Sequence, residues 1–448
     1  MKTIVSNDIK IIDFQEDIGI EIWCDENLIL DNPDWITANR RGAYVGNIPR
    51  RLTLYERKGN MLVLPFGTLK SIWRFIKDHE IVLDFPPGEA LQMIGDIQLY
   101  TYQHEALLNL INAKNGILQA PCGSGKTQIG LKLIRELKQK ALWITHTLDL
   151  IEQAKSRAKQ YFEGDFGIIS GGMVNIGADI TFATVQTLSA LDLSRYKNEW
   201  NVIVVDECHK VAGSPTRLGQ FYKVLSNLSA RHKFGLSATL HRGDNLIEST
   251  FAIIGPLVYN ITGKQVGDKT YKALHKKIPL FTPSSFKYLD TDGTLLHNEL
   301  INYLTENVER NVKVAEYIKH HNHYGIVLSH RVEHLTKLRE LIGYGEILTG
   351  ATRKKDRKAI LERARSGEVT LILSTYSLAK EGLDVPILDR LFLATPQKDY
   401  AIVKQSAGRI ERNLDGKPQP EIYDFTDIQI SYCERAYLTR KRILAKEL

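Results

Sequence analysis

From about residue 95, short apolar runs alternate with segments whose apolar residues recur every three or four positions. The runs predict buried strands, and the segments between them predict helices. The predicted strands are 116–120, 141–145, 166–169, 180–183, 202–205 and 234–237, with helices over 126–138 and 148–160. This order predicts βα units arranged around a buried parallel sheet.

The same rhythm restarts after about residue 300. The predicted strands there are 325–329, 346–348, 369–374, 390–394 and 421–425, again with helical segments between them. Residues 432–448 predict a basic helix on the surface. Residues 261–298 are less regular and are interpreted as the connection between two successive α/β domains, 95–260 and 299–448.

Residues 1–90 differ from the rest and predict a small β-rich or α+β domain. The alternating segments 9–14, 18–23 and 61–64 predict strands joined by turns. Pro86-Pro87-Gly88 marks the expected boundary. The expected fold class is therefore α/β, with two parallel-sheet domains preceded by this smaller one.

Charge is sorted within the first domain. Residues 8–34 contain nine acids and one base, whereas residues 40–74 contain eight bases and one acid, with Tyr44 and Tyr55 among the bases. Such a stretch can follow phosphates while an aromatic ring packs on a base or sugar. The candidate nucleic-acid contacts here are Arg40, Arg41, Arg50 and Arg51. A solvated hairpin face explains the same pattern equally well.

Composition adds little to this picture. The 448 residues carry a formal net charge of +7, which is compatible with a polyanionic partner without requiring one. The four cysteines form no CxxC pair, so neither a disulfide framework nor a structural zinc site is expected. The N-terminus has no secretory pattern and no apolar run is long enough to span a bilayer, so we expect a cytoplasmic protein with no membrane partner.

The strongest local signal is Ala120-Pro-Cys-Gly-Ser-Gly-Lys-Thr127, between a predicted strand and a predicted helix. That context is the one a phosphate-binding P-loop requires. Gly123, Ser124 and Gly125 allow the backbone amides to surround a phosphate at the N-terminus of a helix. Lys126 can then reach the β- and γ-phosphates, and the Thr127 hydroxyl can bind Mg²⁺.

A second signal is the predicted strand 202–205, which runs directly into Asp206 and Glu207. Two adjacent carboxylates at the end of a buried strand are unfavourable unless a cation lies beside them. Asp206 is therefore the candidate Mg²⁺ ligand, and Glu207 is the candidate base that orients and deprotonates an attacking water.

Asp206-Glu-Cys-His209 resembles the DExH box of superfamily 2 helicases and translocases, and other segments resemble further motifs of that family in the family's order. They are a Q motif at 99–106 with Gln103 as its glutamine, motif Ia at 143–153, motif Ib at 182–187, motif III at 237–239, motif IV at 326–331, a phosphate-contacting motif at 348–350, motif V at 374–386 and motif VI, QxxGRxxR, at 405–412. The resemblance covers about residues 95–430. It implies two tandem RecA-like domains and hydrolysis of ATP with Mg²⁺.

The resemblance also implies roles for individual residues. It adds Gln405, Arg409 and Arg412 as catalytic residues; Gln103, Gly382 and Asp384 as nucleotide contacts; and Thr147, Thr184, Ser329, Arg331, Thr349, Gly350 and Thr375 as nucleic-acid contacts. Arg409 and Arg412 are expected one helical turn apart, so that both can face a γ-phosphate held by the other domain. Taken singly, the arginines also suit ion pairs with Glu411 or Asp415, and each threonine suits a cap or turn.

The box reads DECH rather than DEAD, and motif VI lacks the HRxGR typical of DEAD-box RNA helicases. The combination is similar to XPB-like, RecG-like and UvsW-like DNA motors, and the layout is similar to the UvsW-like branch-migration helicases of large tailed coliphages. This implies forked or four-way DNA as partner, contacted mainly through phosphates, in recombination or repair within a host cytoplasm. An RNA helicase, a translocase subunit of a restriction system, and a nucleotide-gated clamp or annealing protein remain alternatives.

Overall fold

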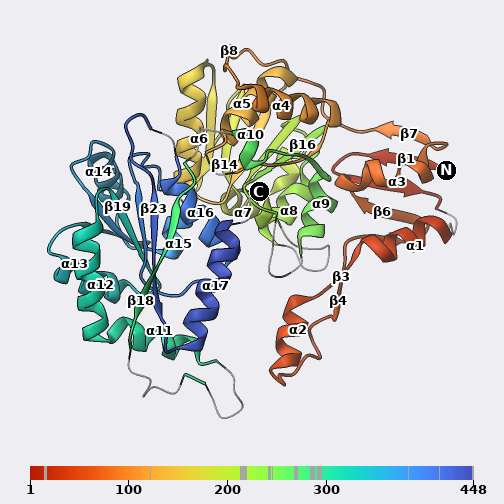
Figure 1. Cartoon of the computed structure of the whole chain (residues 1–448). Helices are drawn as coiled ribbons and strands as arrows, with labels where there is room; N and C mark the ends of the chain where they lie inside the picture. Colours follow the sequence, from red (N-terminus) through yellow and green to blue (C-terminus); the bar gives the residue numbers. More distant parts are fainter. Residues whose placement is uncertain are drawn as a thin grey trace. The chain divides into compact units, whose positions relative to one another are not determined.

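The computed structural model describes residues 1–14, 18–121, 123–211, 219–240, 244, 246–266, 271–282, 288–289, 295–381, 383–412 and 414–445. The chain divides into two compact units, Met1–Ile261 and Thr262–Leu448. The colours of Figure 1 follow the chain through both units.

The first unit begins with a five-stranded mixed sheet in the order β5-β6-β2-β1-β7, with helices packed beside it (Figure 1). Its elements are β1 (Lys2–Val5), β2 (Asp8–Ile12), α1 (Ile18–Asn27), β5 (Glu56–Lys58), β6 (Met61–Pro65), the 3₁₀ helix η1 (Phe66–Thr68), α3 (Leu69–Ile76) and β7 (Glu80–Leu83). The predicted strands 9–14 and 61–64 are confirmed as β2 and β6. The expected α+β character of this region is confirmed.

The prediction of a strand over 18–23 was wrong, because these residues begin helix α1. In a strand, Ile20 and Ile22 would share one face. In the helix, Ile20, Cys24 and Leu28 lie at four-residue spacing and are buried, whereas Ile22 is 51% exposed. The apolar residues after position 23 therefore distinguish the repeat of a helix from the two-residue repeat of a strand.

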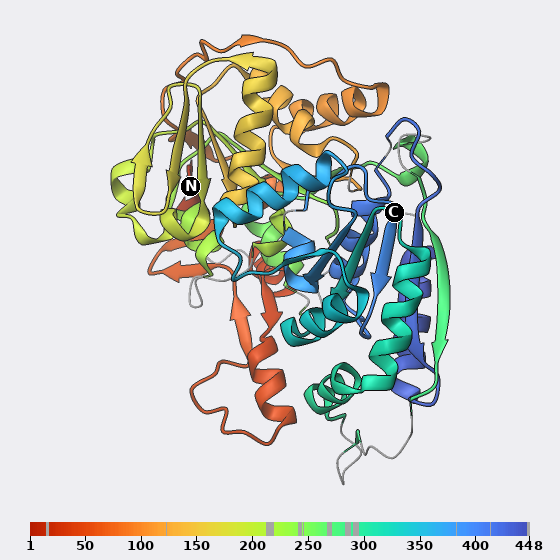
Figure 2. The ribbon, with the colours of Figure 1, turned by 90° about the vertical axis from the view of Figure 1, so that its left-hand side faces the viewer.

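Residues 29–53 leave the five-stranded sheet as an arm, shown with its loop in Figure 2. It consists of β3 (Ile29–Asp31), α2 (Pro33–Arg40), a loop over 41–50 and β4 (Arg51–Thr53). β3 and β4 pair in antiparallel fashion and form a two-stranded stalk. The Asn32 side chain closes the stalk by donating to the Pro49 carbonyl and accepting from the Asp34 amide.

The second part of unit 1 is an eight-stranded sheet in the order β13-β12-β14-β10-β15-β16-β9-β17, parallel except for β13. Its strands are β9 (Gly116–Gln119), β10 (Ala141–Thr145), β12 (Phe166–Ser170), β13 (Met173–Asn175), β14 (Ile180–Thr184), β15 (Val202–Asp206), β16 (His232–Ser237) and β17 (Leu257–Asn260). The remaining elements are β8 (Ile94–Gly95), α4 (Thr101–Ala113), α5 (Lys126–Leu137), α6 (Leu148–Tyr161), β11 (Phe162–Glu163), α7 (Val185–Ala190), η2 (Leu193–Tyr196), η3 (Cys208–Lys210), α8 (Gln220–Asn227) and α9 (Ile247–Ile254). All six predicted strands and both predicted helices of this region are confirmed.

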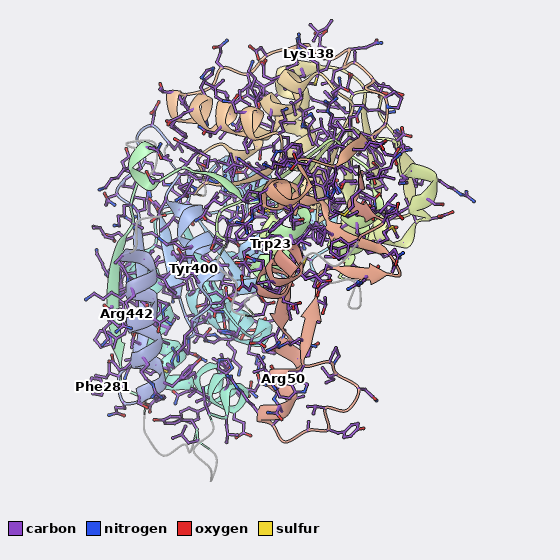
Figure 3. All side chains as sticks on the ribbon, turned by 90° about the vertical axis from the view of Figure 1, so that its right-hand side faces the viewer. Trp23, Arg50, Lys138, Phe281, Tyr400 and Arg442 are labelled. Atoms are coloured by element: carbon purple, nitrogen blue, oxygen red, sulfur yellow. The ribbon has the colours of Figure 1, made fainter. Side chains whose placement is uncertain are left out.

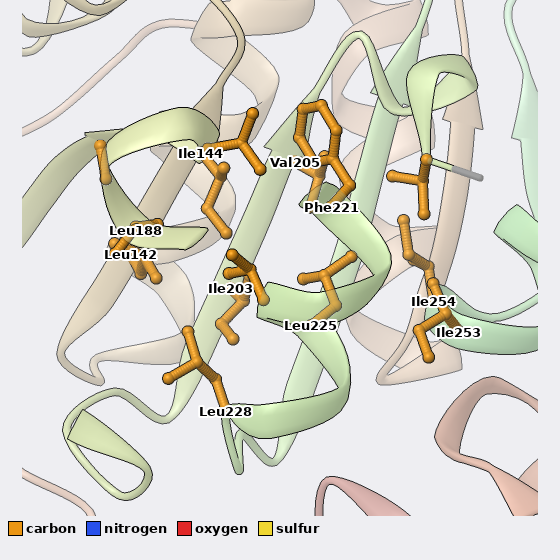
Figure 4. Packing of buried hydrophobic residues seen from close by; sticks show 14 of the residues in the cluster. Leu142, Ile144, Leu188, Ile203, Val205, Phe221, Leu225, Leu228, Ile253 and Ile254 are labelled. Atoms are coloured by element: carbon orange, nitrogen blue, oxygen red, sulfur yellow. The ribbon is translucent and has the colours of Figure 1, made fainter. Parts of the chain in front are cut away.

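One face of this sheet is covered by α7, α8 and α9. Ile203 and Val205 of β15 point toward Phe221 and Leu225 of α8, as Figure 4 shows. The central strands are buried on both faces, so they carry continuous apolar runs rather than alternating ones. This is why the sequence pattern located them correctly.

The small N-terminal sheet is docked on the edge of this larger core. Gly67 lies so close to the C-terminal turn of α9 that a Cβ there would overlap the Phe251 carbonyl. Lys233 of β16 is fully buried beneath the small domain; its ammonium donates to the Leu225 carbonyl at 2.8 Å and lies 4.8 Å from the centre of the Phe66 ring. The two sheets therefore form a single body.

The second unit is built on a six-stranded parallel sheet in the order β18-β23-β22-β19-β21-β20. Its strands are β18 (Leu274–Leu280), β19 (Gly325–Ser329), β20 (Glu346–Leu348), β21 (Leu371–Thr375), β22 (Arg390–Leu393) and β23 (Glu421–Asp427). Its helices are α10 (Gly263–Val266), α11 (His297–Glu306), α12 (Val308–His321), α13 (Val332–Ile342), α14 (Lys354–Arg365), α15 (Tyr376–Glu381), α16 (Tyr400–Ile410) and α17 (Ser431–Ala445). The five predicted strands are confirmed, and β18, within the segment expected only to connect the domains, adds a sixth.

The helix predicted within 432–448 is confirmed as α17, and its Lys441 and Arg442 are exposed, but Arg440 does not lie on the surface. Arg440 is 1% exposed and forms a two-pronged ion pair with Asp424 of β23, with N–O distances of 2.7 and 2.6 Å. No local pattern indicated that Arg440 would be buried against a carboxylate sixteen residues earlier. Arg310 of α12 pairs with buried Asp427 in the same way.

Within the described part of the chain, no helix combines the length and the apolar character needed to cross a membrane.

Burial of Lys233 predicts a specific dependence of stability on pH. Burial lowers the pKa of this lysine to about 7, against about 10.4 in an unfolded chain. Between these values the unfolded state binds more protons, so the free energy of unfolding contributed by this site rises with pH. We expect wild type to gain up to about 1.4 kcal/mol per pH unit over Lys233→Met between pH 7 and 10 in urea titrations. Exposed Lys159→Met serves as the control, and parallel pH profiles for wild type and Lys233→Met would refute the assignment.

Candidate functional site

The loop between β9 and α5 has the geometry of a phosphate cradle. Gly123 and Gly125 both have left-handed backbones, with φ of 83° and 82°, and a Cβ on Gly125 would overlap the Gln103 side chain. The Ser124 hydroxyl donates to the Pro121 carbonyl at 2.7 Å and closes the turn. Cys122 lies outside the described residues. The loop ends at the N-terminus of α5, where the helix dipole favours an anion.

Lys126 lies over this loop. Its ammonium donates to the carbonyls of Ala120 and Pro121, at 2.9 and 3.1 Å. These acceptors are neutral, and Lys126 has no ion pair among the residues that the structure describes, so a phosphate can replace them at small cost. Thr127 follows in the first turn of α5.

Gln103 is bound to the P-loop itself. Its Oε1 accepts from the Tyr100 amide at 3.0 Å, and its Nε2 donates to the Ser124 carbonyl at 2.8 Å. Tyr102 also donates to the Ser124 carbonyl. Gln103 therefore fixes the P-loop to the start of α4, a structural contact that the sequence did not reveal; its reading of a nucleotide base stays a prediction.

Asp206 and Glu207 lie at the carboxyl end of β15, as predicted. Burial and, next, the charge of Glu207 raise the pKa of Asp206 to about 7, although Lys126 opposes this. Glu207 adopts a left-handed backbone with φ of 53°, a conformation that costs energy for a residue with a side chain.

Glu207 is connected to motif III through His209. The His209 Nδ1 lies 3.2 Å from the Glu207 carboxylate and 2.9 Å from the Ser237 hydroxyl. Ser237 in turn donates to the Thr239 carbonyl at 2.6 Å. The role of His209 was missed by the sequence reasoning, although the histidine of the DECH box was its available signal.

The donor set of this site fits a nucleotide phosphate and a divalent cation. Asp206 is a buried carboxylate whose ionisation is opposed by its neighbour, and a hard cation would remove that penalty. Two left-handed glycines and a lysine bound to carbonyls complete an anion cradle beside it. The chemistry of these residues therefore matches the predicted ATP and Mg²⁺ site.

In unit 2, Arg409 lies near the end of α16 and donates to the carbonyls of Ala379 and Leu383, at 3.1 and 3.2 Å. Arg412 forms an ion pair with Asp384. The expectation that both arginines lie on one turn of a helix was wrong, because α16 ends at Ile410. The pairing also differs from the acids considered in the sequence, since Asp384 comes from motif V.

Gln405 lies in α16 and is nearly fully buried, and its Oε1 has no hydrogen-bond partner among the residues that the structure describes. An acceptor left without a donor in a buried position is unfavourable. Gly382, the other predicted nucleotide contact of motif V, lies outside the described residues.

The hydroxyls predicted to meet nucleic acid in unit 1 have partners within the protein. Thr147 caps α6 by accepting from the Leu150 amide at 3.4 Å. Thr184 donates to Thr187 at 3.0 Å. Gln186 connects the two motifs by donating to the His146 carbonyl. The loops after β10 and β14 therefore support one another, and their phosphate contacts stay predictions.

The corresponding residues of unit 2 lie at the carboxyl ends of β19, β20 and β21. Ser329 is fully buried against His334, Arg331 donates to Asn302 and Asn298, and Thr375 contacts Ser377. Thr349 is mostly buried, whereas Gly350 beside it is exposed. The structure places all five at one edge of the sheet, and leaves their contact with nucleic acid as a prediction.

The four predicted arginines of the N-terminal region belong to the arm. Arg40 ends α2, Arg41 follows it, and Arg51 begins β4. Arg50, labelled in Figure 3, lies 5.3 Å from the centre of the Trp35 ring.

Comparison with known proteins assigns this arrangement to a family. The family model described as "Type III restriction enzyme, res subunit" matches residues 96–242, and "Helicase conserved C-terminal domain" matches residues 306–413. The chain belongs to the superfamily 2 helicases. Helicases of this superfamily are ATP-dependent enzymes, and both RecA-like domains are present here.

Relatives of the helicase are found in archaea and phages. "DNA 3'-5' translocase XPB2" of Sulfurisphaera tokodaii is 27% identical over 383 residues, covering 76% of this chain and 84% of the relative. "Probable helicase D10" of Escherichia phage T5 is 26% identical over 345 residues, covering 75% and 72%. The solved structure of T4 UvsW aligns over 99% of this chain and 97% of its own, at 19% identity and a TM-score of 0.43, a value too low to support a functional argument.

The P-loop of the helicase predicts a strong effect of Gly125→Ala. The added Cβ would overlap Gln103 in a backbone conformation that alanine rarely adopts, so the cradle must distort. We expect at least a tenfold weaker affinity for ATP, measured by equilibrium binding. Gly263→Ala, where a Cβ meets open space, serves as the control. Unchanged ATP affinity in Gly125→Ala would contradict the assigned cradle.

Proposed function

We propose that this helicase is an ATP-driven DNA motor that unwinds or branch-migrates forked and junction DNA. The observation that carries the proposal is the chain of side-chain contacts within unit 1 from Glu207 through His209 to Ser237 of motif III. Such a connection suits an enzyme that transmits hydrolysis to a bound polymer. The relative named as a DNA 3'-5' translocase supports DNA as that polymer.

Each residue has a defined task in the proposed hydrolysis. The P-loop amides and Lys126 hold the nucleotide phosphates, while Asp206 and Thr127 hold Mg²⁺. The cation, when bound, neutralises charge on the phosphates during transfer. Glu207 orients the attacking water and accepts its proton. His209 fixes the Glu207 carboxylate and is itself positioned by Ser237.

Arg409 and Arg412 of unit 2 would contact the phosphates held by unit 1 and stabilise the charge that develops during transfer. Arg412 must first exchange its ion pair with Asp384 for the phosphate. ATP then favours a closed pair of units, and hydrolysis releases it. A repeated cycle of this kind moves one unit along the nucleic acid relative to the other.

DNA would lie across the predicted contacts of both units and of the arm. Phosphate contacts fix the position of a protein on nucleic acid without reading its sequence. The hydroxyl-bearing loop residues, Arg331 and the arm arginines therefore predict binding with little base specificity and strong salt dependence. The accessory region of residues 1–90 supplies the contact that favours branched substrates.

The first test is steady-state ATP hydrolysis by wild type and Glu207→Gln. Each protein is assayed without nucleic acid and with single-stranded, duplex, forked and four-way DNA and RNA. We expect branched DNA to stimulate wild type most strongly, and Glu207→Gln to lose at least a hundredfold in rate because it cannot accept the proton of the attacking water. Stimulation by RNA alone would indicate an RNA helicase, and no stimulation by any nucleic acid would refute the proposed motor.

The second test concerns the arginines of motif VI. Arg409→Ala and Arg412→Ala should each lower kcat by about a hundredfold or more, since arginine fingers contribute about 10³–10⁵ in rate. ATP binding should persist because the cradle belongs to unit 1. Arg353→Ala, an exposed arginine of unit 2, is the control and should keep the wild-type rate. Full activity in both motif VI variants would contradict the proposed role.

A further inference from the structure

The structure divides the basic stretch 40–74 into two parts with different surroundings. On the body of the small domain, Arg57 pairs with Glu21 and Lys58 pairs with Glu56, whereas Lys70 and Arg74 belong to helix α3. Tyr55 is likewise engaged, because its hydroxyl donates to Asp25 at 2.8 Å. Ion pairs within the small domain thus account for Arg57 and Lys58.

The arm is different. None of Arg40, Arg41, Arg50 and Arg51 has an ion-pair partner among the described residues, and residues 35–51 contain no acid. The acids of the arm, residues 29–53, are Asp31 and Asp34, so its four arginines leave an excess of positive charge on this projection. A surface of this kind is complementary to a polyanion whose charges are regularly spaced.

The arm is also folded without a core of its own. Helix α2 has no buried residue, yet its start is closed by the buried Asn32, and the Ala43 amide returns to the Ala38 carbonyl at 2.9 Å. Ordering such a segment costs conformational entropy that its own packing does not offset. In the loop of the arm, Tyr44 is 83% exposed and lies between the two pairs of arginines in the sequence.

We propose that the arm recognises branch points in DNA: its arginines bind the phosphates of a duplex segment, and Tyr44 stacks on the base pair exposed where the duplex ends or forks. The inference rests on the proposed DNA motor and assigns to the arm the choice of substrate. Arginines bind any duplex alike, because phosphates are present throughout. An aromatic ring stacks only where a base face is open, and a continuous duplex interior offers none.

The decisive experiment compares Tyr44→Ala and Tyr44→Phe in the full-length protein. Dissociation constants are measured for a forked duplex and for a covalently closed circular duplex. The circle has no nick and no end, so it exposes no base pair. We expect Tyr44→Ala to weaken fork binding about fivefold or more, the lower range for removal of a base-stacking ring, and to leave circular-duplex binding unchanged. Tyr44→Phe keeps the ring and should behave as wild type.

The role of charge is tested separately with two double variants, each of which replaces two basic residues by glutamine. Arg40→Gln/Arg41→Gln should weaken binding to both DNAs by the same factor and make the salt dependence shallower by about one unit of slope per lost phosphate contact. Arg57→Gln/Lys58→Gln removes the same charge from the body of the domain, where it is already paired, and should leave both affinities near wild type. Equal effects of the two double variants would overturn the role of the arm.

The remaining outcomes are distinguishable. An unchanged preference for forks in Tyr44→Ala would overturn stacking, and equal losses in Tyr44→Ala and Tyr44→Phe would assign the effect to the hydroxyl instead. DNA-independent ATP hydrolysis and thermal unfolding confirm that each variant is folded. If DNA stimulates wild-type hydrolysis but the fork preference is unaffected, only the arm proposal fails; if no DNA stimulates it, the proposed function fails as well.

Discussion

Two adjacent carboxylates, Asp206 and Glu207, lie at the end of a buried strand. The repulsion between their charges is the constraint on which the neighbouring side chains and backbone depend. Burial would favour the neutral form of both, whereas the roles proposed for Asp206 and Glu207 need each to be charged. Lys126 supplies positive charge from the P-loop, and His209 contacts the Glu207 carboxylate. Glu207 itself has a left-handed backbone. These residues fit a divalent cation, which would offset the repulsion between the two carboxylates.

Buried charge recurs as a means of joining elements that are distant in the sequence. Arg440 joins α17 to β23 through Asp424, and Arg310 joins α12 to the same strand through Asp427. These pairs are fully desolvated, so removal of one partner leaves an uncompensated charge. Lys233 differs because carbonyls and an aromatic ring are its neighbours, and it lies where the small N-terminal sheet meets the larger one.

The charges of the arm are arranged differently from these buried pairs. Its arginines are exposed and lack carboxylate partners among the described residues, on a projection without a packed core. Because the small sheet forms one body with the eight-stranded sheet, the arm is attached to the unit that contains the P-loop. The contact that we propose for the arm would act on the choice of substrate and leave the hydrolytic residues untouched.

The sequence by itself determined the two parallel sheets, the P-loop and the DECH box. Strands buried on both faces must be apolar throughout, and phosphate cradles are formed by residues adjacent in the chain, so both leave local patterns. Only the tertiary structure decided that 18–27 is helical, that Arg412 pairs with Asp384 beyond the end of α16, and that Arg440 is buried. It also separated the paired bases of the N-terminal domain from the arginines of the arm. Each of these depends on partners remote in the sequence, whose positions no local pattern records.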